Sequence, residues 1–390
     1  MYSRRLSWSS SLNAHSARVA ELRQNGAVLL DLTSSNPTAC GFGYPHEAVA
    51  SAFAQIRDFG YFPDPFGEVA AREVVRTYYL ERNLDVSSDR ILLTASTSEA
   101  YGQLFKLLCD PGDEILIPLP SYPLFEYLAS LESVRAAPYW LQYDGSWHID
   151  FEGLEAGLTE RTKAIVVVNP NNPTGSFLKQ GETDRLFAIA KERELALIAD
   201  EVFFDYPLSE KAGRTRTFVD RNDALSFSLN GLSKTAGMPQ MKLGWLVING
   251  PERQRRAARE RLELILDTYL SVNTPVQRAL PELMNIGREL QTHIQGRIRH
   301  NYEVIEKKLT GSSAHPLHTE GGWSAIVQLP RTRSEDEWLQ RLLENERLIV
   351  QPGYFFDMPS EPYVVLSLLT PPQDLERGIE SLIRTAHSGD

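Results

Sequence analysis

Six short apolar runs between residues 90 and 250 limit most strongly what this chain can fold into. They are rich in Ile, Val and Leu and do not alternate with polar residues, which is typical of strands buried on both faces of a parallel sheet. The runs are RILLTA (90–95), DEILIPLP (113–120), KAIVVVNP (163–170), LALIAD (195–200), ALSFSL (224–229) and GWLVING (244–250). Segments of helix length separate them, and residues 97–108 and 181–195 show apolar spacings of three and four. We predict an α/β fold whose large domain has a mostly parallel sheet flanked by helices.

After residue 250 the pattern changes to long charged helical segments followed by shorter strand candidates, which predicts a smaller α+β domain. A chain of 390 residues is long enough for two domains. The predicted helices are 251–270 and 276–309, and the strand candidates are 322–330, 347–353 and 363–369. We assign the domains as an N-terminal arm with part of the small domain (1–45), a large domain (46–275) and a small C-terminal domain (276–390).

Composition excludes several classes of function. With 40 basic and 51 acidic residues, the net charge of −11 argues against a nucleic-acid partner. Only Cys40 and Cys109 are present, without a CxxC pair, and the eight histidines form no HExxH, so we expect no metal site. The N-terminus has no apolar core behind its basic residues, and no run of about 18 apolar residues occurs. We therefore expect a cytoplasmic protein with no membrane partner.

Polar or aromatic side chains follow five of the six runs. Ligands of open parallel sheets bind at the carboxyl ends of the strands, so these side chains are expected at one edge. In chain order they are Ser96, Thr97 and Ser98, then Tyr122, Asn172, Asp200 and Lys234. Several have simpler explanations, because the hydroxyl residues can cap a helix and NNPTG (171–175) can be a turn. Asp200, which ends a buried run, would be costly without a cationic or hydrogen-bonded partner.

Together these groups match the needs of pyridoxal 5′-phosphate. That cofactor requires a lysine for its Schiff base, an acid beside the pyridine nitrogen, an anion site and a ring to stack on. A helix N-terminus rich in hydroxyls can bind the phosphate as well as being capped. Lys234 suits the amine role because burial lowers the pKa of a lysine.

The sequence resembles the class I/II aminotransferases, which are pyridoxal-phosphate enzymes of fold type I. The resemblance covers nearly the whole chain and is most specific in NPNNPTG (169–175), ADEVFFDY (199–206) and LSKTAGMPQMKLGW (232–245). Weaker matches are FPDPFGEVAAREVV (62–75), PGDEILIPLPSYPLFEY (111–127), EGGW (320–323) and QPGYFF (351–356).

This resemblance implies a role for each residue. Lys234 would be the Schiff-base lysine and proton carrier, and Asp200 would pair with the pyridine nitrogen. Asn172 would bond the 3′-oxygen of the ring and contact substrate, and Tyr122 would stack on the ring. The phosphate would be held by Ser96, Thr97, Ser98 and Lys242. The implied activity is amino transfer between an amino donor and a 2-oxo acid in a homodimer. A lyase or decarboxylase of the same fold stays open, since these residues activate Cα without choosing the bond that breaks.

Four positions depart from the family pattern. Phe203 stands where the family usually has a tyrosine, and Gly231 where it often has a serine. Lys242 replaces an arginine, which keeps the charge and loses the bidentate fork. Phe62 replaces the tyrosine that reaches the phosphate of the neighbouring subunit, and Tyr61 beside it is a candidate substitute.

A fifth departure concerns the substrate. Val365 stands where the family has the arginine that grips the substrate α-carboxylate, and no arginine occurs between Arg347 and Arg377. Either another cation replaces it, with Arg4 and Arg5 as candidates that could equally be a solvated terminus, or the substrate has no carboxylate there. We favour the replacement, and both options stay open at this point.

Overall fold

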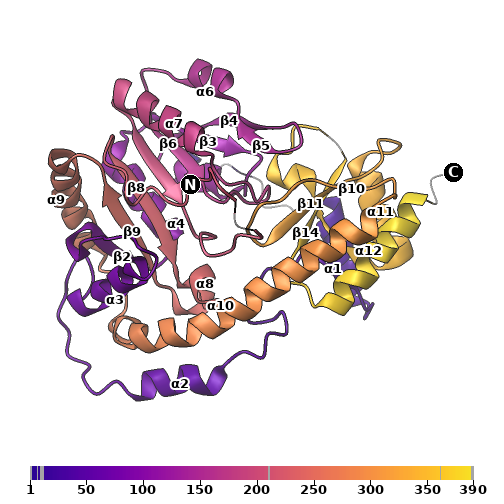
Figure 1. Ribbon diagram of the computed structural model, residues 1–390, viewed down its shortest axis with the longest axis horizontal. Coiled ribbons are helices and arrows are strands. Elements are labelled where there is room, and N and C mark those ends of the chain that lie inside the picture. The colour runs from indigo at the N-terminus through magenta and orange to yellow at the C-terminus, as the bar shows by residue number, and fades with distance from the viewer. Residues whose placement is uncertain (1, 7, 9–12, 210, 361, 388–390) are drawn as a thin grey trace.

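The computed structural model describes residues 2–6, 8, 13–209, 211–360 and 362–387. A central sheet of eight strands forms its larger part, with four antiparallel strands beside it (Figure 1). The strand order is β2 (Ile91–Thr94), β9 (Gly244–Asn249), β8 (Ser226–Gly231), β7 (Ala196–Asp200), β6 (Thr162–Val168), β3 (Glu114–Leu119), β4 (Arg135–Tyr143) and β5 (Trp147–Ile149). The predicted α/β fold is therefore confirmed.

The central sheet is mostly parallel. Strands β8, β7, β6, β3 and β4 run parallel to one another, whereas β9 is antiparallel to both β2 and β8, and β5 is antiparallel to β4. All six predicted runs form strands, and β4 and β5 were not predicted. The burial pattern explains the omission, because β4 carries exposed residues such as Arg135 and Trp140 between buried ones.

Helices cover both faces of the central sheet. Neighbouring residues of a strand point to opposite faces, so consecutive residues of β2 pack against different helices. Leu92 packs on the side of α4 (Thr97–Leu108), α5 (Leu124–Leu131) and α9 (Glu252–Tyr269). Leu93, the next residue, packs on the side of α3 (Val69–Leu80) and the first half of α10 (Thr274–Leu309). Farther along the sheet, α7 (Gln180–Glu192) buries Leu186 and Phe187 against β6 and β7. The predicted helix 181–195 thus ends three residues early, where the chain turns into β7.

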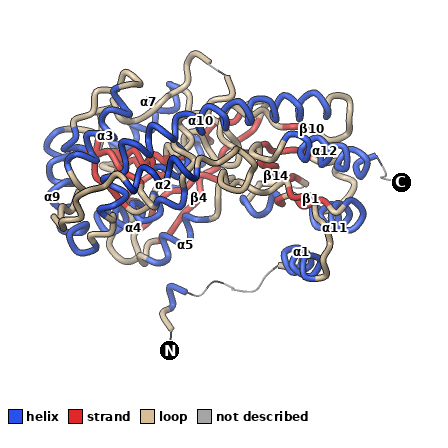
Figure 2. The backbone as a smooth tube through the Cα atoms, turned by 90° about the horizontal axis from the view of Figure 1, so that it is seen from below, coloured by secondary structure: helices blue, strands red, loops and turns tan. Residues whose placement is uncertain are grey.

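The small sheet has the order β10 (His315–Pro316), β11 (Ser324–Gln328), β14 (Tyr363–Ser367) and β13 (Gln351–Pro352). The predicted strand 347–353 is split, because β12 (Leu348–Ile349) pairs instead with β1 (Leu30–Asp31). Helices α11 (Glu335–Glu346) and α12 (Pro372–His387) pack here, and α1 (Ala14–Gln24) lies beside α11 (Figure 2).

One 36-residue helix, α10 (Thr274–Leu309), extends from the central sheet to the small sheet (Figure 1). Its first half buries residues such as Leu280 with the α3 side of the central sheet, and its second half buries Ile294 and Ile305 with the small sheet. The remaining elements are α2 (His46–Ala54), α6 (Phe151–Gly157), α8 (Leu232–Thr235) and the 3₁₀ turns at 4–6, 88–90, 239–241 and 353–356.

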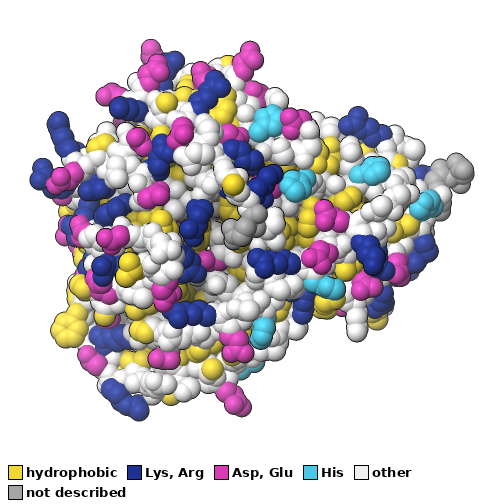
Figure 3. Space-filling view, viewed as in Figure 1, with side chains coloured by type: hydrophobic (Ala, Val, Ile, Leu, Met, Phe, Trp, Pro, Cys, Tyr) yellow, Lys and Arg dark blue, Asp and Glu magenta, His cyan; other side chains and the backbone are white. Residues whose placement is uncertain are grey.

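On the face seen in Figure 3, acidic and basic side chains are interspersed. No helix in the described part of the chain combines the length and the apolar character needed to cross a bilayer.

Candidate active site

A cavity of about 600 Å³ lies at the carboxyl ends of the central strands, and β11, β13 and β14 of the small sheet form its other side. Eight of the predicted site residues line it: Ser96, Thr97, Ser98, Tyr122, Asn172, Asp200, Lys234 and Lys242. Their convergence follows from the parallel direction of the strands that precede them.

Lys234 lies in α8, directly after β8. Its Nζ atom is 4.6 Å from the centroid of the Trp323 ring and 5.4 Å from that of Phe203. Burial lowers the pKa of Lys234 to about 8, against an opposing effect of Asp200. The Tyr206 hydroxyl donates to the Lys234 carbonyl over 2.7 Å and fixes the backbone beneath the amine. An amine with this pKa has a large neutral fraction at mildly alkaline pH, as a nucleophile requires.

Asp200 ends β7 and is held from two sides. Its Oδ1 accepts from the Val202 backbone N–H over 3.2 Å, and its Oδ2 accepts from the Tyr101 hydroxyl over 3.1 Å. Burial raises the pKa of Asp200 to about 6, although both hydrogen bonds and the charge of Lys234 oppose that rise. A buried carboxylate that is still ionised at neutral pH is suited to a cationic partner in the cavity.

The serine and threonine residues form the N-terminus of α4. The Ser96 hydroxyl caps the helix by accepting from the Glu99 backbone N–H over 3.1 Å, as the capping explanation for these hydroxyl residues requires. The free N–H groups of the first turn and its positive dipole end lie in the same cavity as Lys242. The arrangement has the chemistry of a phosphate site.

Asn172 and Tyr122 line other parts of the cavity. The Asn172 Oδ1 accepts from the Ser324 hydroxyl over 3.1 Å, which connects the loop after β6 to β11. Tyr122 is 45% exposed, and its ring centroid is 6.1 Å from that of Phe355 in an edge-to-face contact, so part of the side chain is free to contact a planar ligand. An amine, a carboxylate, an anion site and an open aromatic ring together fit pyridoxal phosphate.

Arg4 and Arg5 do not line this cavity. They form a short turn on the outside of α5, where an Arg5 guanidinium nitrogen donates to the Leu131 carbonyl over 2.9 Å. The cavity is lined by Leu124, at the other end of that helix. Seven residues of helix separate the two ends by roughly 10 Å. The chain therefore does not bring either arginine to its own cavity.

The structure gives a packing reason for Gly231. An added Cβ at this position would lie 2.9 Å from the Gly244 Cα and 3.0 Å from the Leu243 carbonyl oxygen. Both neighbours are backbone atoms, so a serine cannot enter without moving β9. Of the other departures, Phe203 and Val365 line the cavity, while Tyr61 and Phe62 are 69% and 70% exposed.

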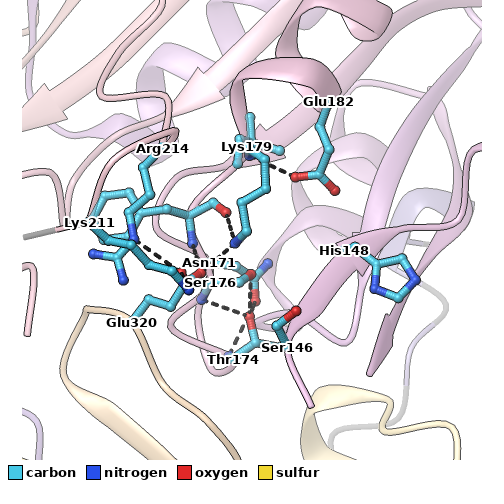
Figure 4. Close-up of polar contacts among 12 residues, drawn as sticks. Ser146, His148, Asn171, Thr174, Ser176, Lys179, Glu182, Lys211, Arg214 and Glu320 are labelled. Atoms are coloured by element: carbon cyan, nitrogen blue, oxygen red, sulfur yellow. Dashed lines mark hydrogen bonds and ion pairs between the residues drawn. The ribbon is translucent and has the colours of Figure 1, made fainter. Parts of the chain in front are cut away.

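Glu320 connects three loops close to the cavity (Figure 4). Its buried carboxylate contacts the Lys179 amine at 2.5 Å and the Arg214 Nε at 3.1 Å, and it accepts from the Phe177 backbone N–H over 3.1 Å. These ion pairs hold the pKa of Glu320 below its usual value in spite of burial. The loops that Glu320 joins carry Asn172 on one side and Trp323 on the other.

Sequence reasoning missed several residues that line the cavity. Tyr101 lies four residues after Thr97 on α4, and that spacing places both on one helix face, so a signal was present. Trp323 lay within a quoted motif but received no role. Gln351 also lay within a quoted motif, QPGYFF (351–356), without a role. Ser324 carries no motif signal, because the pairing of the small sheet brings it here.

A buried lysine after a sheet strand, an acid ending the neighbouring strand and an anion site at a helix N-terminus are the features of fold type I pyridoxal-phosphate enzymes. The pattern of the family described as "Aminotransferase class I and II" matches residues 27–382, and the chain belongs to this family.

Two curated relatives are similar to the chain. Glutamate-pyruvate aminotransferase AlaA of Escherichia coli (strain K12) is 32% identical over 310 residues, which cover 79% of this chain and 73% of that protein. Alanine aminotransferase of Mycobacterium tuberculosis (strain H37Rv) is 29% identical over 384 residues, covering 95% of this chain and 88% of the relative. Among solved structures, alanine aminotransferase from Pyrococcus furiosus has a TM-score of 0.88 at 23% identity and full coverage of both chains, which supports the fold. The chain is an aminotransferase.

Proposed function

We propose that this enzyme binds pyridoxal 5′-phosphate in the cavity around Lys234 and moves an amino group between an amino donor and a 2-oxo acid. The observation that carries the proposal is the buried amine of Lys234, with its pKa lowered to about 8, in one cavity with Asp200 and the start of α4. When bound, the cofactor supplies a carbonyl carbon for the amino group and a ring that accepts the electrons of the broken Cα–H bond.

The residues of the chain have the following proposed tasks. Lys234 would hold the cofactor covalently, and its amine would take up the proton from the substrate Cα. Asp200 would pair with the protonated ring nitrogen, and the Tyr101 hydroxyl donates to that carboxylate and orients it. Asn172 and Tyr122 orient the ring. The first turn of α4 (Ser96, Thr97, Ser98) and Lys242 bind the phosphate.

The covalent role of Lys234 is tested by borohydride reduction of the yellow holoenzyme followed by peptide mapping. We expect the cofactor on Lys234, and a Lys234→Ala variant should carry no label. Lys242 is the matched control because its amine lines the same cavity, and labelling at Lys242 would contradict the assignment.

The reaction class needs its own experiment, because a lyase or decarboxylase would use the same residues. Alanine and glutamate are the first donors to test, since the similar enzymes are named for alanine, glutamate and pyruvate. We expect the donor nitrogen in a new amino acid. Release of ammonia or carbon dioxide instead would support the alternative activity.

We further propose a cytoplasmic homodimer with the domain boundaries given above. Three exposed aromatic side chains, Phe59, Tyr61 and Phe62, support a partner surface, with exposures of 66%, 69% and 70%. Both cysteines are free thiols, which suits a reducing compartment. Light scattering at assay concentration tests the dimer, and a fully active monomer would contradict it.

A further inference from the structure

Among the described residues, no charged side chain lines the small-sheet side of the cavity. Among the described residues that line the cavity, the charged ones are Lys234, Lys242 and Asp200, and all three belong to the central-sheet side. The opposite wall combines apolar and neutral polar groups: Thr33, Ser35, Trp323, Ser324, Gln351, Phe356, Val365, Leu366 and Ser367. The proposed function engages all three charged groups with the cofactor, which leaves none for a substrate carboxylate.

Three hydroxyl groups of this wall already donate their protons within the protein. Thr33 donates to the Asp31 carboxylate over 2.6 Å, and Ser367 donates to the Ser34 carbonyl over 2.6 Å. Ser324 donates to the Asn172 Oδ1 over 3.1 Å. The wall still offers the indole N–H of Trp323, which is buried without a partner, but this donor is neutral and does not supply the charge of an arginine.

Val365 lies in the middle of this wall, on β14 between Ile326 and Gln351. It is 2% exposed and offers only methyl groups. The nearby Arg297 is engaged elsewhere, because its guanidinium donates to the carbonyls of Cys40 and Leu369, each over 3.2 Å, and it does not line the cavity.

We propose that this enzyme accepts primary amines, whose amino-bearing carbon carries no carboxylate, about as readily as the matching α-amino acids. The inference rests on the proposed amino-transfer function. A site built around a buried cation rejects a ligand without the carboxylate, because the cation is then left unpaired. This wall carries no such penalty, and an apolar substituent can pack on Val365 and Phe356. The acceptor meets the same wall, so a 2-oxo acid and the matching aldehyde should also differ little.

The test compares phenylalanine with 2-phenylethylamine as donors to the holoenzyme, with both products measured by chromatography. We expect kcat/KM values within about tenfold of each other, because no ion pair separates the two donors. A preference of more than about 100-fold for the amino acid would overturn the proposal, since that ratio is the size of a charge-assisted contact to the carboxylate.

A binding measurement separates this proposal from the proposed function. Calorimetry of the holoenzyme with 3-phenylpropanoate and 3-phenylpropan-1-ol, which carry no amino group, should give dissociation constants within about tenfold. If neither donor reacts, this pair still decides the present inference, while alanine and glutamate decide the proposed function. A carboxylate preference above about 100-fold would overturn it.

Two variants report the gain of a cation. Val365→Arg should raise the preference for the carboxylate by roughly 10- to 150-fold in both measurements. If Val365→Arg does not fold, Gln351→Arg serves instead, because Gln351 pairs with Val365 and is only partly buried. A folded variant that leaves the preference unchanged would show that this wall does not face the substrate and would overturn the inference.

Discussion

The buried carboxylate of Glu201, next to Asp200, makes a sharp prediction about stability. Glu201 is 1% exposed and accepts from the Thr217 hydroxyl over 2.7 Å and from the Phe218 backbone N–H over 2.8 Å. Burial raises the pKa of Glu201 from 4.5 to about 8, although these hydrogen bonds oppose the rise. The folded state thus holds a proton that the unfolded state releases above about pH 4.5.

The sign and size of the pH effect on stability follow from the difference between the folded and unfolded pKa values of Glu201. Because the folded pKa is raised, the contribution of Glu201 to stability is complete below pH 4.5 and is lost as the pH rises to about 8. At 1.36 kcal/mol for each pKa unit, the total loss is about 5 kcal/mol, of which about 3 kcal/mol falls between pH 5.5 and pH 9. Glu201→Gln removes the titration and keeps one oxygen as acceptor for the Phe218 backbone N–H, while its amide can donate to the Thr217 hydroxyl.

The assay is urea unfolding of wild type and Glu201→Gln across this pH range. The free energy of unfolding of the variant minus that of the wild type should rise by about 3 kcal/mol from pH 5.5 to pH 9. All other titrations cancel in this difference. The two proteins should be equally active, since Glu201 does not line the cavity. Parallel stability curves would refute the reasoning, because they would mean that Glu201 is ionised in the folded state throughout.

Three further predictions concern the site and its surroundings. Asp200→Ala should retain a weakly bound cofactor while kcat falls roughly 100-fold or more, since a preorganised charge is lost; near-normal turnover would exclude its role at the ring nitrogen. Gly231→Ser should lower the free energy of unfolding by roughly 1–3 kcal/mol, because its Cβ meets backbone. Gly296→Ala, which has open space around it, is the matched control and should be neutral or slightly stabilising, and equal effects would disprove the packing argument. Glu320→Gln should cost about 3 kcal/mol in chemical unfolding, because it removes a buried charge from its cations, whereas Glu155→Gln, in an exposed pair, should cost under about 1 kcal/mol.

The fold could be predicted where strands are buried on both faces, because all their residues are then apolar. Strands such as β6 and β7 are covered on both faces, so their residues are apolar without interruption and are visible as runs. Strand β4 was not predicted because it lies next to the edge of the sheet, where buried Tyr139 has exposed neighbours along the strand. The reversed direction of β9 was also beyond reach, since a fully apolar run has the same pattern in either direction.

The candidate site was predictable to the extent that it follows strand ends. Asp200 and Lys234 could be found because strand order in a parallel sheet converts sequence position into position at one edge. The wall around Val365 was beyond this reasoning, because only the pairing of β11, β13 and β14 brings it to the cavity. The ion pairs of Glu320 could not be predicted either, since Arg214 and Lys179 lie more than a hundred residues away along the chain.

The pairing of Leu30 with Leu348 has a consequence for how the protein is made on the ribosome. Strand β1 is synthesised before the central sheet, and its partner β12 is synthesised after it. The central sheet, from β2 to β9, can form and receive the first half of α10 while the small sheet is still being synthesised. Val365 and Ser367 are added after the whole central sheet, so the cavity gains its second wall only once the small sheet has been synthesised. Until then, a nascent chain holds Lys234 at an open sheet edge.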